Sequence, residues 1–379
     1  MIYFDNSATT KIYPEVAEFI CKHSQQEFCN PSGLYFPSLQ VKQEMQEAKQ
    51  KLLKILHATN KDIIFTASAT EANNYALRCF VNKNKKLLIS EGEHASIYQT
   101  ALYLQQNQVE VEFIKTLADG TLDIEDLKHK LTDNVGLVSF IHVNNETGAI
   151  NDAKKIGEII KEKCPTALIH CDGVQAFCKM DINLNDLGID MYTLSSHKVH
   201  GPRGVGALIF NSKTPPKKPL IFGGGQENGW RSGTENASSI LGFVMASEIM
   251  QKDMARNNMQ VRNLKWTLLE LIQELNFTIN GSLDKTISNI LSISFENIKG
   301  EVLVHMLEQD KIYVSTGSSC NSKHTGNRVL MSMGKNKQQE AGNIRISFSE
   351  QNTMEEVKEF ANILIKDVNK IKGLEIWKK

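Results

Sequence analysis

The chain has 379 residues, enough for two ordinary domains, and with 41% hydrophobic and 23% charged residues its composition is that of a globular protein. Its 43 Lys and Arg residues balance 43 Asp and Glu residues, so charge gives no reason to expect nucleic acid or an anionic membrane as a partner. No apolar run approaches the roughly 20 residues that span a bilayer, and the N-terminus lacks signal-peptide features. We therefore expect a cytoplasmic protein, and the odd count of 7 cysteines argues against a disulfide framework.

Helix-like and strand-like segments alternate through the first two-thirds of the chain. Apolar residues at helical spacing predict a helix over 41–56, behind Pro37, and further helices from Thr70, after His94 and over 156–163. Strands separated by helices favour a mostly parallel sheet with helices on both faces. The strands are predicted from short apolar runs at 63–65, 86–89, 135–143, 167–170, 189–194 and 205–210.

The last third of the chain has a different pattern. A proline-rich connection at 211–220 leads to a long helix from about Glu235 past Met254, and the final helix begins with a capping box of Thr353 and Glu356. We expect a large domain at 12–254 and a smaller α+β domain made of 1–11 and 255–379. The smaller domain is predicted to have strands at 287–295, 312–314 and 344–348 and a helix from Gly300.

Ligands of open α/β sheets lie beyond the carboxyl ends of the strands, so the residues that follow each predicted strand are candidates. Asp172 follows one strand, and is either a simple turn former or a carboxylate that keeps a pyridinium nitrogen protonated. Lys198 follows the next strand, after Ser195 and His197 and before a Gly/Pro loop. A lone lysine is usually a solvated surface residue, but this setting is typical of a Schiff-base lysine surrounded by phosphate ligands.

Two further segments carry candidate residues. Thr70 lies where a strand meets a helix among small residues, and is either an ordinary N-cap or part of an anion site at the helix N-terminus. Cys320 lies in a polar Gly/Ser-rich stretch that continues through Lys323 and His324. An exposed thiol near basic residues is a nucleophile candidate, the alternative being a buried hydrophobic cysteine. The other six cysteines fall in or beside predicted elements and are interpreted as structural.

Taken together, these segments resemble the NifS/IscS-like cysteine desulfurases, which are class V, fold-type I enzymes that depend on pyridoxal phosphate (PLP). The resemblance covers nearly the whole chain and implies an α/β fold. In this fold a large domain holds a mostly parallel seven-stranded sheet covered by helices, and a smaller α+β domain carries the catalytic cysteine. The motifs that carry it are Phe4–Thr10, Asn30–Leu34, Gly223–Glu227, Arg231–Asn236 and Ile344–Ser347.

The resemblance also implies a role for each matching residue. Lys198 is expected to hold PLP covalently, with Asp172 at the pyridine nitrogen, Gln175 at the ring hydroxyl and His94 stacked on the ring as an acid/base. Arg345 is expected to bind the substrate carboxylate. Further cofactor contacts are expected from Thr70, Asn145, Ser195 and His197, and from Thr234, which in this family reaches the phosphate of the neighbouring subunit and so implies a homodimer.

The implied activity converts L-cysteine into L-alanine and leaves the sulfur as a persulfide on Cys320. An acceptor protein then takes the sulfur for iron–sulfur cluster assembly or for tRNA or cofactor thiolation. A class V aminotransferase, a selenocysteine lyase and a non-catalytic sulfur-relay scaffold are the alternatives. The chain departs from the family pattern at Ser68, at Tyr35 in place of a histidine, and after Cys320, where Gly326–Leu330 replaces Pro-Ser-His/Tyr-Val-Leu.

Overall fold

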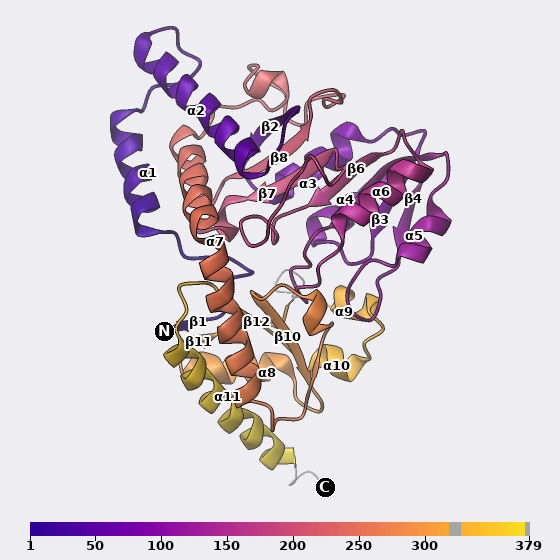
Figure 1. The fold of residues 1–379 in the computed structure, drawn as a ribbon, viewed down its shortest axis with the longest axis vertical. Coiled ribbons are helices and arrows are strands. Elements are labelled where there is room, and N and C mark those ends of the chain that lie inside the picture. The colour runs from indigo at the N-terminus through magenta and orange to yellow at the C-terminus, as the bar shows by residue number, and fades with distance from the viewer. Residues whose placement is uncertain (318–326, 376–379) are drawn as a thin grey trace.

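Residues 1–317 and 327–375 are described in a computed structural model of the chain. Figure 1 shows two lobes, the upper built around a large sheet and the lower around a smaller one, with helix α7 (Ala237–Leu271) running from one to the other. Within the described ranges, no helix is long and apolar enough to cross a membrane.

The upper lobe contains a seven-stranded sheet, as expected. Strand β8 pairs antiparallel with both of its neighbours, and the five strands on the far side of it are all parallel. The mostly parallel sheet is therefore confirmed. Its order is β2 (Lys61–Thr66), β8 (Gly206–Asn211), β7 (Met191–Ser195), β6 (Leu168–Asp172), β5 (Val135–Ile141), β3 (Lys86–Ser90) and β4 (Val111–Ile114).

Helices cover both faces of this sheet because successive strand residues point to opposite sides. Ile64 packs in the apolar cluster that also holds residues of α3 (Ala69–Phe80) and α4 (Ala95–Gln106). Its neighbour Ile63 packs in the other cluster, with residues of α2 (Phe36–Ile55), α6 (Ala153–Lys163) and α7. The remaining helices of this lobe are α1 (Pro14–Gln26) and α5 (Ile124–Lys130).

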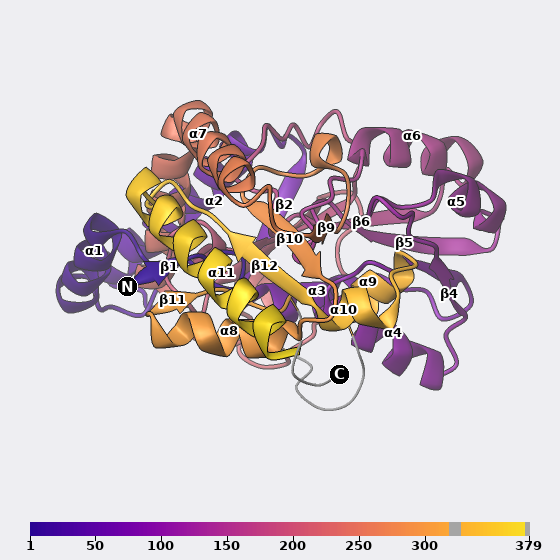
Figure 2. The same ribbon diagram turned by 90° about the horizontal axis from the view of Figure 1, so that it is seen from below.

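The lower lobe has its own apolar core, which includes Phe4 from the N-terminus together with residues of the last third of the chain. Figure 2 shows α11 (Met354–Glu375) across this lobe beside α8 (Gly300–Gln309). Its sheet is antiparallel with the order β12 (Asn343–Ser347), β10 (Ile290–Phe295) and β9 (Phe277–Ile279), while β1 (Ile2–Tyr3) pairs in parallel with β11 (Ile312–Tyr313). Two short helices, α9 (Arg328–Ser332) and α10 (Lys337–Ala341), complete it.

Helix ends show one confirmed and one wrong prediction. The capping box is present, since Thr353 N–H donates to Glu356 Oε2 at 3.1 Å and Glu356 N–H donates to Thr353 Oγ1 at 3.2 Å. Of the two readings of Thr70, the N-cap is wrong: Ser68, two residues earlier, caps α3 and accepts from Glu71 N–H at 3.2 Å, and the helix begins at Ala69. The domain boundary near residue 255 falls inside the continuous helix α7, and it stays a prediction.

Candidate active site

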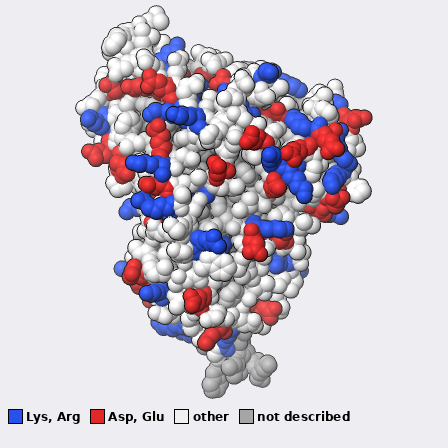
Figure 3. Space-filling view, viewed as in Figure 1, with Lys and Arg blue, Asp and Glu red and all other residues white. Residues whose placement is uncertain are grey.

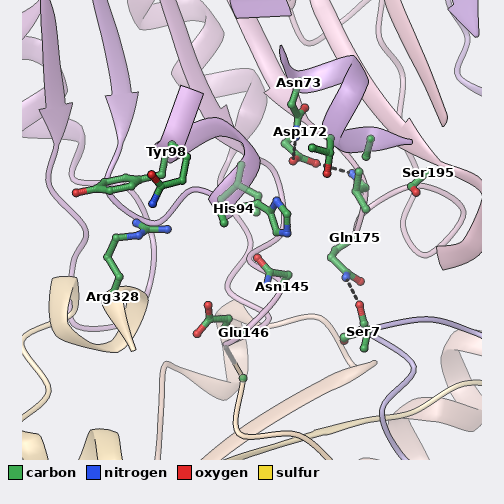
Figure 4. A pocket seen from close by; sticks show the side chains of 18 of the residues that line it. Ser7, Asn73, His94, Tyr98, Asn145, Glu146, Asp172, Gln175, Ser195 and Arg328 are labelled. Carbon is green, nitrogen blue, oxygen red and sulfur yellow. Dashed lines mark hydrogen bonds between the residues drawn. The ribbon is translucent and has the colours of Figure 1, made fainter. Parts of the chain in front are cut away.

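A cavity of about 970 Å³ lies between the two lobes, at the carboxyl ends of the parallel strands (Figure 4). This is the position at which open α/β sheets bind ligands. Nine of the predicted site residues line it: Thr70, His94, Asn145, Asp172, Gln175, Ser195, His197, Lys198 and Arg345. Thr234 is exposed and is not among the lining residues, and Cys320 lies outside the described residues.

Lys198 ends a short 3₁₀ helix (Ser196–Lys198) directly after β7 and faces the cavity. Its Nζ donates to the carbonyl oxygen of Ala8 at 2.6 Å and to that of Ser7. Burial lowers the pKa of Lys198 to about 7, and the positive charge of Arg345 adds to the effect. A large share of the amine is therefore neutral near pH 7, which is the nucleophilic form.

Asp172 is the last residue of β6 and is buried. Both carboxylate oxygens are held: Oδ1 accepts from Val174 N–H at 3.0 Å and Oδ2 accepts from Asn73 Nδ2 at 2.8 Å. These two donors fix the orientation of the carboxylate at the cavity wall. Gln175 is also oriented, because Nε2 donates to Ser7 O at 2.9 Å and Oε1 accepts from Lys179 Nζ at 3.0 Å.

His94 precedes α4 and acts as its N-cap, with Nδ1 accepting from Ser96 N–H at 3.1 Å. Burial lowers the pKa of His94, the Asp172 carboxylate opposes this, and Lys198 and Arg328 reinforce it. The imidazole is therefore neutral at pH 7. Figure 4 shows the ring in the middle of the site, between Asp172 and Asn145.

The start of α3 lies at one end of the cavity, which Ser68, Ala69 and Thr70 line. The first backbone N–H groups of a helix have no partner within it, so this arrangement suits an anion. Gly206 on β8 allows the close approach of this turn, because a Cβ there would lie 2.5 Å from the carbonyl carbon of Ser68. Ser195 Oγ is buried nearby and has no hydrogen-bond partner among the described residues. His197 Nδ1 lies 3.1 Å from Thr9 Oγ1, and burial lowers the pKa of His197 to about 3, so the ring stays neutral.

Arg345 on β12 brings a buried guanidinium to the opposite end of the cavity. Nη2 donates to Asp5 Oδ1 at 2.7 Å, and Nη1 donates to the carbonyl oxygens of Asn145 at 2.9 Å and Gly317 at 3.3 Å. Nε of Arg345 and Oδ1 of Asn145 have no partner in the described part of the chain. This end of the site thus offers the Nε of Arg345 as a donor and the Oδ1 of Asn145 as an acceptor.

Several residues of the cavity wall were not among the site residues predicted from the sequence. Glu146 is buried there, and burial raises its pKa. The guanidinium of Arg328 lies 4.1 Å from the centre of the Tyr98 ring and donates to the carbonyl oxygens of Glu91 and Glu93. Arg328 was noticed only as a departure from the family pattern, and nothing in its local sequence indicates a cation facing the cavity.

Known proteins match this chain over its whole length. A profile of the aminotransferase class-V family matches residues 2–360. Cysteine desulfurase IscS 1 of Archaeoglobus fulgidus is 33% identical, covering 99% of this chain and 98% of its own. Cysteine desulfurase IscS of Clostridium botulinum is 35% identical, covering 96% of this chain and 94% of its own. Among solved structures, a NifS-like protein superposes with a TM-score of 0.91 at 31% identity and covers 97% of this chain and 99% of its own.

The chain therefore belongs to the class-V aminotransferase family, whose enzymes depend on PLP. Within that family it groups with the IscS and NifS-like cysteine desulfurases. The resemblance to the NifS/IscS-like cysteine desulfurases and the fold class expected from the sequence are both confirmed.

Proposed function

We propose that the chain is a PLP-dependent cysteine desulfurase that converts L-cysteine into L-alanine and leaves the sulfur as a persulfide on Cys320. The observation that carries the proposal is one cavity in which a lysine of lowered pKa, an oriented carboxylate and a neutral histidine face the same space: Lys198, Asp172 and His94. Relatives named as cysteine desulfurases over nearly the full chain support it.

The residues fit PLP. Lys198 supplies the amine for the covalent link, and Asp172 supplies a carboxylate for the pyridine nitrogen. The α3 N-terminus and the unpartnered Ser195 hydroxyl suit the phosphate, together with Thr70 and His197. When bound, PLP supplies an electron sink for negative charge that develops at the substrate Cα.

The side chains of this protein would then handle the protons and the substrate. Lys198, with its lowered pKa, removes and returns the proton at the substrate Cα. Arg345 and Asn145 bind the substrate carboxylate, with the unpartnered Nε of Arg345 as a donor and Asn145 held beside it by the hydrogen bond from Arg345 Nη1 to the Asn145 carbonyl oxygen. His94 acts at the substrate sulfur.

Cys320 completes the reaction in this proposal as the nucleophile that attacks the substrate sulfur. A sulfur–sulfur bond forms, the bond between sulfur and the substrate Cβ breaks, and its electron pair stays with the carbon fragment, which takes up a proton and leaves as alanine. L-Cysteine as substrate is supported by the solved structure titled SspA in complex with cysteine, which is 28% identical and has a TM-score of 0.82.

A homodimer is proposed as the assembly. Thr234 is exposed and away from its own cavity, as a residue that reaches a neighbouring subunit must be. The α1–α2 connection exposes the large apolar side chains of Leu34 at 93% and Phe28 at 77%, and Phe36, the first residue of α2, is exposed at 77%. Such apolar exposure is typical of a surface that another protein covers.

Light scattering on the purified protein tests the assembly. Twice the chain mass is expected for the unaltered protein and the single-chain mass for Leu34→Asp. The matched change Met259→Asp, on the exposed face of α7 at 63% exposure, is expected to leave the dimer intact. A monomeric unaltered protein would contradict the proposal.

A protein that accepts the sulfur from Cys320 is proposed as the second partner. On the face seen in Figure 3, acidic and basic side chains are interspersed without a large patch of one sign. This distribution favours no nucleic-acid partner on that face. The cytoplasmic location stays a prediction from the sequence.

The activity is tested by incubating the purified protein with PLP, L-cysteine and a reductant, and measuring sulfide and alanine together. Equal yields of the two products are expected, abolished in both Cys320→Ala and Lys198→Ala. Cys320→Ala is expected to keep the absorbance of bound PLP, whereas Lys198→Ala loses the covalent link. Consumption of an amino acid with a keto acid and no sulfide would instead indicate an aminotransferase.

A further inference from the structure

His94 is connected to Asp172 by a hydrogen-bonded network that includes the side chains of Asn73 and Ser96. Asn73 Nδ2 lies 2.8 Å from Asp172 Oδ2 and 2.9 Å from Ser96 Oγ, and Ser96 Oγ lies 2.8 Å from His94 Nδ1. Both linking side chains are buried, Asn73 on α3 and Ser96 in the first turn of α4. Figure 4 shows Asn73 beside Asp172, with His94 pointing into the same cavity.

The direction of the first two hydrogen bonds follows from the chemistry of the groups. A carboxylate can only accept, so the amide nitrogen of Asn73, and not its oxygen, faces Asp172. The second hydrogen of that nitrogen is donated to Ser96 Oγ. Ser96 Oγ therefore accepts from Asn73 and keeps its own hydrogen available for donation.

The direction at His94 is fixed by the backbone. Ser96 N–H lies 3.1 Å from His94 Nδ1 and can only donate, so Nδ1 carries no proton. The Ser96 hydroxyl then donates to the same nitrogen at 2.8 Å. Because a neutral imidazole carries one proton, that proton is on Nε2.

We infer that Ser96 and Asn73 are positioning residues that hold His94 in the tautomer protonated at Nε2, with this proton directed into the cavity. In this tautomer His94 donates a hydrogen bond to the substrate sulfur and cannot accept one from it. The inference rests on the proposed function for the reaction that it serves, whereas the tautomer is a property of the protein alone.

The charged groups that face His94 come from three other elements: Asp172 on β6, Lys198 in the 3₁₀ helix after β7, and Arg328 on α9. The two cations disfavour a second proton on the ring and Asp172 favours it. Loss of the Ser96 hydroxyl leaves Nδ1 with one donor fewer, so the ring becomes easier to protonate. The acid limb of the pH profile of kcat/KM should then move to higher pH.

The direct test is nitrogen NMR of the holoenzyme labelled with ¹⁵N-histidine, with the His94 resonances assigned from a His94→Gln variant. We expect an unprotonated Nδ1 and a protonated Nε2 in the unaltered protein. A protonated Nδ1 would overturn the inference without any activity measurement. If the protein makes no sulfide from cysteine, the proposed function fails while this spectrum still decides the tautomer.

Variants then separate positioning from a merely structural role. Ser96→Ala keeps the backbone N–H donor to His94 Nδ1 and removes the hydroxyl donor. It should therefore shift the Nδ1 resonance, move the acid limb to higher pH and lower kcat roughly 3- to 10-fold, the range that one hydrogen bond supports. Ser96→Thr keeps the hydroxyl and should restore all three properties.

The matched control is Ser139→Ala, which removes a hydroxyl 2.9 Å from His170 Nδ1, a serine–histidine pair that does not line the cavity. This variant should change neither the His94 spectrum nor the pH profile. A Ser96→Ala protein that resembles Ser139→Ala in both measurements would show that Ser96 only stabilises the fold.

Discussion

The buried amine of Lys198 should destabilise the cofactor-free protein at neutral pH, and this contribution should disappear in alkali. The pKa of Lys198 falls from 10.5 to about 7, chiefly because of burial. A pKa difference of one corresponds to about 1.4 kcal/mol, so the destabilisation caused by burying the Lys198 amine is at most about 5 kcal/mol. The cavity admits water to the amine, and roughly half of this, about 2–3 kcal/mol, is expected after screening.

The sign follows from proton binding. Between about pH 7 and 10.5 the unfolded lysine holds a proton that the folded lysine has lost, so the contribution of Lys198 to the free energy of unfolding rises with pH across this window. The full destabilisation by the buried Lys198 amine is present below about pH 7 and vanishes above about pH 10.5. Lys198→Met removes it, so the variant should gain stability relative to the unaltered protein at pH 7 and lose that gain towards pH 10.

Urea unfolding of both cofactor-free proteins at pH 7 and pH 10 measures the effect. The variant should exceed the unaltered protein in free energy of unfolding by about 2–3 kcal/mol more at pH 7 than at pH 10. Hydrogen bonds lost at Ser7 and Ala8 largely cancel in this comparison. Lys213→Met, which alters an exposed lysine, should give no such difference. An equal difference in free energy of unfolding between Lys198→Met and the unaltered protein at the two pH values would refute this role of Lys198.

Two further substitutions test the two ends of the cavity. Arg345→Lys keeps the charge but loses the planar guanidinium and its free Nε, so KM for cysteine should rise about 10- to 100-fold. The control Arg256→Lys, at an exposed position, should leave KM unchanged. Equal KM values for the two variants would contradict the role of Arg345 at the substrate carboxylate. Gly206→Ala places a Cβ 2.5 Å from the Ser68 backbone, so it should lower the free energy of unfolding by about 1–3 kcal/mol and weaken PLP retention. The control Gly373→Ala, which meets open space on α11, should be neutral or stabilising. A Gly206→Ala protein with unchanged stability would contradict the close approach of β8 to Ser68.

Much of the sheet could be predicted from the sequence because its strands are continuous apolar runs buried on both faces. The run Ile63–Phe65 is an example. Strand β4 was not predicted, since it is a four-residue edge strand that carries Glu112 and is mostly half-buried. Exposure leaves β4 with little apolar pattern to read, whereas β2, at the other edge of the sheet, is buried over its last four residues and was predicted.

The sequence predicts candidate site residues where they end or closely follow a strand, as Asp172 and Lys198 do. Asn73 and Ser96 were not predicted, because each lies within a helix and its importance depends on a partner far away in the chain. The start of α3 is ambiguous in the sequence because Ser68 and Thr70 are both acceptable caps, and only the hydrogen bond to Glu71 distinguishes them.

The central claim is that the cavity is a PLP site built on Lys198. Borohydride reduction of the holoenzyme, followed by digestion and peptide mass spectrometry, tests it most directly. We expect the pyridoxyl group on the peptide that contains Lys198, and a large loss of this labelling when L-cysteine is added before reduction. Labelling of a different lysine, such as the buried Lys179, or no labelling at all, would contradict the account.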